Sequence, residues 1–96
     1  MKTIPQNCKP YKRTPVFSES SVPAGLLRAH QTKVGTWGSI VVVEGQLLYR
    51  VLEPETTEYL LDSQQSGVVE PGVLHEVEPQ GNVRFFVEFY RAEDGG

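Results

Sequence analysis

The chain contains a single cysteine, Cys8, in 96 residues, so an intramolecular disulfide cannot form. No apolar run approaches the roughly 20 residues of a membrane-spanning helix, and residues 1–7 lack the apolar core of a secretory signal. Lys and Arg together number 9 against 12 Asp and Glu, which gives a net charge of −3 and no electrostatic basis for binding nucleic acid or an anionic membrane. We therefore expect a cytoplasmic protein that binds neither.

A sustained helical period is also missing. Only residues 24–30 suit a turn or two of helix, and nine glycines and seven prolines interrupt the chain along its length. The apolar content of 39% is enough for a modest core, and the length fits one domain, residues 1–96. Prolines at positions 5, 10 and 15 predict that residues 1–16 form an extended arm without a regular ladder, and residues 92–96 are predicted to fray.

Short β-type runs separated by turn residues fill the middle of the chain. The runs at 39–43 and 47–52 flank Glu44-Gly45-Gln46, a pattern typical of a hairpin. Pro71-Gly72 predicts a tight turn, because Pro presets φ and Gly accepts a positive φ. The remaining strand candidates lie at residues 57–61, 68–70, 73–77 and 83–90. Strands at this spacing predict an all-β sandwich or barrel.

Alternation along the last two predicted strands indicates which side chains face inward. His75 shares a face with Val73 and Val77, so we expect its imidazole to point into the core or into a cavity. In the last strand one face is wholly apolar and consists of Val83, Phe85, Val87 and Phe89. The opposite face carries Glu88, which we expect to lie outside the cavity, in an ion pair or at a subunit contact.

The only two histidines, His30 and His75, each lie beside a turn of the predicted sheet, which favours one shared interior site. Neutral imidazole is the commonest metal ligand in proteins, so the pair predicts a divalent metal site for zinc, iron, nickel or manganese. The third ligand would be Glu78 or Glu88, in a set of two histidines and one carboxylate. The alternative for His75 is a buried imidazole that is satisfied by a backbone carbonyl or a tyrosine.

Three further residues are candidates for ligand binding. Arg28 and Lys33 lie close to His30 in the sequence and would suit an anionic ligand, and Trp37 would line the cavity. The same residue types are also compatible with solvated charges at strand ends and with plain core packing. The periodicity places no serine or cysteine beside a histidine, so nucleophilic catalysis is not expected.

Segments along nearly the whole chain, from about Pro5 to Arg91, match one known family in order. They are YKRTPVF at 11–17, PAGL at 23–26, HQTKVGTW at 30–37, VEPGVLHEVEP at 69–79 and FFVEFYR at 85–91. The sequence resembles the small cupin domain of the tellurite-resistance TehB and YeaR-like proteins. The resemblance implies an all-β, single-domain, cupin-like antiparallel jelly-roll β-barrel around an interior site. It also implies a homodimer, because cupins often pair through sheet edges.

The general cupin signature is matched in part. His30 takes the first histidine place of the first motif, and Thr32 stands where the second histidine would be. The second motif is compressed and ends at His75. Two of the four usual metal ligands are therefore present.

The resemblance leaves the reaction open, and with it the question of whether the chain is an enzyme. It implies a small stand-alone protein, linked to stress or tellurite resistance, with a metal or small-ligand site at His30 and His75. The alternatives are a metal-free module that binds a small anion or metabolite, and an accessory interaction domain without catalysis. In longer TehB-type proteins, methylation belongs to a domain that uses S-adenosylmethionine. We expect no such domain here, because the chain has no room for it and no Gly-rich cofactor loop.

Overall fold

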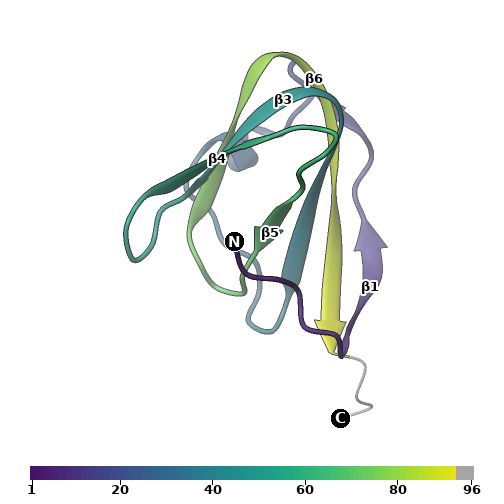
Figure 1. The fold of residues 1–96 in the computed structure, drawn as a ribbon, viewed down its shortest axis with the longest axis vertical. Helices are drawn as coiled ribbons and strands as arrows, with labels where there is room; N and C mark the ends of the chain where they lie inside the picture. The colour runs from purple at the N-terminus through teal and green to yellow at the C-terminus, as the bar shows by residue number, and fades with distance from the viewer. Residues whose placement is uncertain (93–96) are drawn as a thin grey trace.

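The computed structural model describes residues 1–92, which form an all-β fold with one short 3-10 helix (Figure 1). Its elements are β1 (Cys8–Arg13), β2 (Phe17–Ser18), η1 (Ala24–Leu27), β3 (Trp37–Val51), β4 (Thr57–Leu61), β5 (Gly67–Val69) and β6 (His75–Ala92). Neighbouring strands pair antiparallel in the order β1–β6–β3–β4, while β2 also pairs with β6 and β5 with β3. The predicted all-β, antiparallel class is confirmed.

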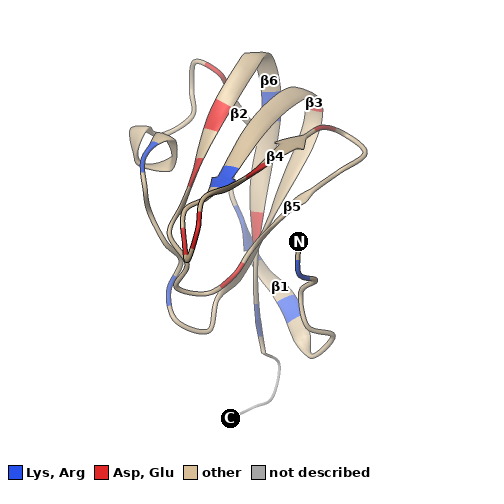
Figure 2. Ribbon diagram, turned by 60° about the vertical axis from the view of Figure 1, so that its left-hand side comes forward, with Lys and Arg blue, Asp and Glu red and all other residues tan. Residues whose placement is uncertain are grey.

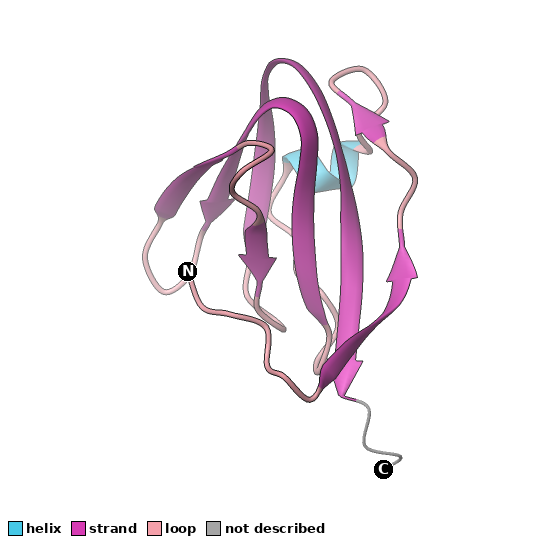
Figure 3. Ribbon diagram, turned by 45° about the vertical axis from the view of Figure 1, so that its right-hand side comes forward, coloured by secondary structure: helices cyan, strands magenta, loops and turns pink. Residues whose placement is uncertain are grey.

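The sheet curves strongly but stays open (Figure 3). Strands β1 and β4 are the two edges of this strand order, and no pairing within residues 1–92 joins them. The reason lies in the registers: β1 pairs with residues 88–92 of β6, which lie beside the start of β3, whereas β4 pairs with residues 47–51 at the end of β3. The two edge strands therefore lie at opposite ends of the long β3–β6 ribbon, and the prediction of a closed barrel is wrong.

The predicted hairpin at Glu44-Gly45-Gln46 is also wrong, because these residues lie inside β3. Strand β3 pairs along its length with β6, and the register shifts on both sides of Gly45, between residues 42 and 44 and between residues 45 and 47. Gly45 has a φ of 81°, and a Cβ at this position would lie 2.1 Å from the carbonyl oxygen of Asn82. The glycine therefore allows a bulge and a bend in a continuous strand, where the local sequence suggested a turn.

Part of the predicted N-terminal arm is a strand. Pro10 lies within β1, which pairs with β6 on one side only, and the ladder is irregular between Pro10 and Lys12. An edge strand tolerates proline because the missing N–H need not contribute to a ladder. Of the predicted frayed tail, Ala92 ends β6, and residues 93–96 lie outside the described residues. None of the helical structure within residues 1–92 has the length and apolar character needed to cross a bilayer.

The core lies on the concave side of the β3–β6 ribbon and confirms the predicted alternation. Val77, Val83, Phe85 and Val87 are buried, and His75 is only 3% exposed. The other buried apolar side chains come mainly from β3 and the short strands, and include Ile40, Val42, Leu47, Tyr49, Leu61 and Val69. Leu26 of η1 packs against this cluster from the N-terminal half of the chain.

Two glycines at the bend provide a matched test of the close approach between β3 and β6. Gly45 and Gly81 both have φ near 80°, but a Cβ at Gly81 would meet nothing within 4 Å. We expect Gly81→Ala to lower the free energy of unfolding by about 1–2 kcal/mol, the cost of a left-handed alanine. Gly45→Ala should cost about 3 kcal/mol or more, because it adds a clash with the Asn82 carbonyl. Urea denaturation measures both, and equal losses would contradict the close approach at Gly45.

Candidate functional site

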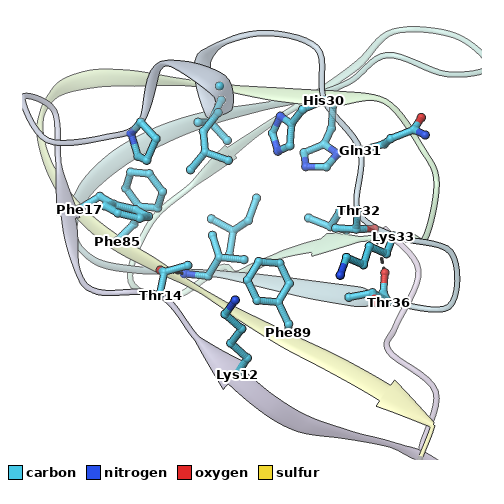
Figure 4. Close-up of a pocket in the computed structure, with 18 of the residues that line it drawn as sticks. Lys12, Thr14, Phe17, His30, Gln31, Thr32, Lys33, Thr36, Phe85 and Phe89 are labelled. Atoms are coloured by element: carbon cyan, nitrogen blue, oxygen red, sulfur yellow. Dashed lines mark hydrogen bonds between the residues drawn. The ribbon is translucent and has the colours of Figure 1, made fainter.

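A pocket of about 520 Å³ opens on the concave face of the sheet (Figure 4). Its size falls within the range of pockets that bind small molecules. Strands β1, β2, β3, β5 and β6, helix η1 and the loop at residues 30–36 all contribute to its wall. The apolar part of the wall includes Phe17, Leu26, Ile40, Val77, Phe85 and Val87.

Residues directly opposite each other in an antiparallel pair project from the same face, and this rule builds the pocket. Phe17 lies opposite Phe85, and their rings meet edge to face with centroids 5.7 Å apart. Lys12 lies opposite Phe89, so its side chain projects from the same face as that ring. Figure 4 shows Lys12 reaching toward the cavity between Thr14 and Phe89.

The two histidines lie opposite each other in the same way. The backbones of His30 and His75 exchange two hydrogen bonds of 2.9 Å, and the ring centroids are 4.0 Å apart. His30 Nδ1 lies 3.1 Å from the Arg28 carbonyl oxygen, and His75 Nδ1 lies 3.0 Å from that of Val73. Because a carbonyl oxygen only accepts, each Nδ1 carries the proton in these contacts. In a neutral ring, Nε2 then keeps its lone pair.

Burial keeps His75 in its neutral form. Desolvation, and to a lesser degree the neighbouring His30, lower the pKa of His75 from 6.5 to about 4, against an opposing contribution from the Val73 carbonyl. The buried imidazole is therefore a hydrogen-bonding group at neutral pH rather than a cation.

The loop that follows His30 places a lysine at the pocket. The amide of Thr36 donates to the Lys33 carbonyl at 3.0 Å, and Gly35, with a φ of 82°, supplies the positive φ of this turn. The Thr32 hydroxyl donates to the Thr36 carbonyl at 2.8 Å and closes the loop further. Lys33 extends from this loop toward Phe89 (Figure 4).

The glutamates predicted as third metal ligands lie away from the histidines. Glu78 projects from the outer face of β6, where the Arg50 guanidinium binds it at 2.9 Å and also pairs with Glu58 and Glu76. These charges lie on adjacent strands β4, β3 and β6 (Figure 2). The hydrogen bond from Arg50 and its charge lower the pKa of Glu78.

Glu88 also faces outward, as the alternation predicted. One carboxylate oxygen accepts a 3.0 Å hydrogen bond from Arg13, and the other accepts a 3.1 Å bond from the Tyr90 hydroxyl. Arg13 lies directly opposite Glu88 in the β1–β6 ladder, while the preceding Lys12 faces the pocket. Neighbouring residues of one strand thus place one cation on each face.

Of the residues predicted as sites, His30, His75 and Lys33 line the pocket. Arg28 and Trp37 are not among its lining residues, and a ligand-binding role for them stays a prediction. The sequence analysis missed Lys12. Residues 8–13 carry no local signal for it, because the prolines of this segment argue against a ladder and the register shift between Pro10 and Lys12 interrupts the alternation.

Comparison with known proteins shows the family of this chain. The family model of the TehB-like domain matches residues 12–87, which are most of the chain. This chain belongs to the TehB-like family. A protein of Haemophilus influenzae strain KW20, named "Probable S-adenosyl-L-methionine-dependent methyltransferase TehB", is 33% identical over 72 residues. That match covers 71% of this chain and 25% of the relative, so the chain spans about a quarter of the longer protein.

Two solved structures have the same fold. A crystal structure of an Escherichia coli K12 protein superposes with a TM-score of 0.89 at 25% identity, covering 98% of this chain and all of the other. The crystal structure of TehB from Haemophilus influenzae gives a TM-score of 0.84 at 28% identity, covering 91% of this chain and 32% of that protein.

These findings correct two functional expectations. The prediction of a metal-binding cupin is wrong: its relatives are named as methyltransferases, and residues 1–92 contain no group of three or more metal-ligating His, Cys, Asp or Glu side chains. The physical reason is that Arg50 and Arg13 hold the candidate glutamates on the opposite face of β6. The expectation of no S-adenosylmethionine domain is contradicted as well, because the relatives are named as S-adenosylmethionine-dependent methyltransferases.

The lowered pKa of His75 predicts a pH-dependent stability. The unfolded chain binds a proton near pH 6.5 and the folded chain only near pH 4, so stability is full above about pH 6.5 and falls as the pH drops toward 4. At 1.36 kcal/mol per pKa unit, the loss approaches about 3 kcal/mol. We expect His75→Gln to remove most of this slope.

Urea denaturation between pH 7 and pH 5 measures the effect before most carboxylates titrate. His30→Gln serves as the matched control, because it removes the other imidazole and leaves the buried one. Identical pH slopes for wild type and His75→Gln would refute the assignment.

Proposed function

We propose that this domain serves S-adenosylmethionine-dependent methyl transfer by binding the small molecule that accepts the methyl group. The observation that carries the proposal is the apolar pocket between η1 and β6, in a chain whose relatives are named as such methyltransferases. A preformed pocket of this size holds a small molecule in one orientation and shields it from water, which is what a transfer reaction requires of an acceptor site.

The lining favours the acceptor over the methyl donor as the ligand. S-adenosylmethionine carries a sulfonium, an ammonium and a carboxylate group, so its net charge is positive. The pocket presents Lys12 and Lys33, and no Asp or Glu within residues 1–92 is among its lining residues. Like charges would oppose binding of the donor here. The donor then binds elsewhere in the complete methyltransferase system.

Several predictions from the sequence accompany this proposal. They are cytoplasmic location, homodimer formation, absence of nucleic-acid or membrane partners, and kinship with the jelly-roll cupins. Such a dimer would pair through a sheet edge or through the outer face, which carries Phe86 and Tyr90.

Adjacent leucines of η1 provide a test of the pocket's role. Leu26 lines the pocket, whereas Leu27 is exposed and does not. We expect Leu26→Trp to fill the pocket. Cells that lack the gene and carry this variant should resemble the deletion strain in growth on tellurite. Leu27→Trp should restore growth to the wild-type level.

Circular dichroism and thermal unfolding would verify that both tryptophan variants fold. Full restoration by a folded Leu26→Trp variant would overturn the proposal. Chemical-shift changes at pocket residues on titration with S-adenosylmethionine would overturn the assignment of the pocket to the acceptor.

A further inference from the structure

The charge around the pocket differs in sign from the charge of the chain. The whole chain has 12 acidic residues and a net charge of −3. No acidic residue within residues 1–92 lines the pocket, whose lining includes Lys12, Lys33 and both histidines. A basic pocket in an acidic protein is a local electrostatic feature, and such features attract ligands of the opposite sign.

The two lysines have no counter-ion within residues 1–92. The described ion pairs use Lys2, Arg13, Arg50 and Arg84, and neither Lys12 nor Lys33 takes part in one. Lys12 projects from the inner face of β1 beside Phe89, and Lys33 extends toward the same ring (Figure 4). Two ammonium groups thus flank one end of an apolar wall.

The two histidines line the other side of the cavity. His75 is neutral at pH 7, and the proton of each Nδ1 is used by a backbone carbonyl. The His75 ring therefore offers an acceptor nitrogen and carries no positive charge. The positive charge of the pocket is concentrated at the exposed lysines, while its buried wall is neutral and mostly apolar.

We infer that the pocket selects small amphipathic anions, with the anionic group bound by Lys12 and Lys33 and the apolar body against Phe85, Phe17 and Leu26. This inference rests on the proposed function and names the class of acceptor. A single carboxylate or similar oxyanion on an aromatic or aliphatic body matches both parts of the lining.

Three probes that share one carbon skeleton test the charge preference. They are 4-phenylbutyrate, 4-phenylbutanol and 4-phenylbutylamine, which are anionic, neutral and cationic at pH 7. We expect the butyrate to bind about tenfold more tightly than the alcohol, the gain from two partly exposed ion pairs, and the amine to bind most weakly. Dissociation constants come from calorimetry, and shifts in ¹H–¹⁵N spectra locate the bound probe.

Lysine variants test whether Lys12 and Lys33 cause the preference for the anionic probe. The double variant Lys12→Gln/Lys33→Gln should bind butyrate and alcohol equally, while Lys9→Gln, on the same strand and outside the pocket lining, should keep the wild-type ratio. In about 1 M NaCl, where the screening length is about 3 Å, the wild-type ratio should shrink toward one.

The outcomes separate this inference from the proposed function. Equal affinity of the wild type for butyrate and alcohol, or a ratio unchanged in the double lysine variant, would overturn the charge selection. If the alcohol still binds and Leu26→Trp abolishes that binding, the proposed pocket function survives such a result. Failure of all three probes to shift the pocket residues would overturn both proposals.

Discussion

The pairing of β6 with three other strands is the constraint on which the rest of the structure depends. Strand β6 pairs with β1, β2 and β3, and the short bridge at His75 adds the loop of His30. Because its side chains alternate, β6 contributes His75, Val77, Phe85, Val87 and Phe89 to the wall of the pocket. A one-residue slip of β6 would move all of these side chains to the solvent face and bring the glutamates inside.

The inward face of β6 could be predicted from the sequence because alternation is a local property. The grouping of His75 with Val77, and of Phe85 with Val87, does not depend on which strand lies beside them, and neither does the outward position of Glu88. The same argument fails for elements whose shape depends on distant partners. Gly45 has the local signature of a turn, but its positive φ forms a bulge because Asn82 and Val83 of β6 pack against it.

The N-terminal segment is a second part of the structure that could not be predicted from the sequence. Three prolines argue against a ladder, yet Cys8–Arg13 pairs with β6 at the edge of the sheet, where one N–H fewer costs little. Only this pairing shows that Lys12 faces the pocket and that Arg13 faces Glu88. The candidate site could therefore be predicted for its histidines and for Lys33, and the contribution of β1 could not.

The outer face of the sheet carries the carboxylates of β6, whereas the inner face carries the two histidines. This separation explains why the two histidines form no metal site. On the outer face, Arg50 pairs with Glu58, Glu76 and Glu78, and water can screen the negative charge that one guanidinium leaves uncompensated. No carboxylate within residues 1–92 lines the pocket on the inner face, and a metal ion there would have only two imidazoles among these residues, fewer than the protein ligands of a tight site. The neutral His75 imidazole can still accept a hydrogen bond, and this side chain can stay buried because it avoids protonation. Charge recognition is then left to the lysines, which remain hydrated when no ligand is bound. Under the proposed function, this division orients an acceptor with its anionic group toward solvent and its apolar body toward Phe85.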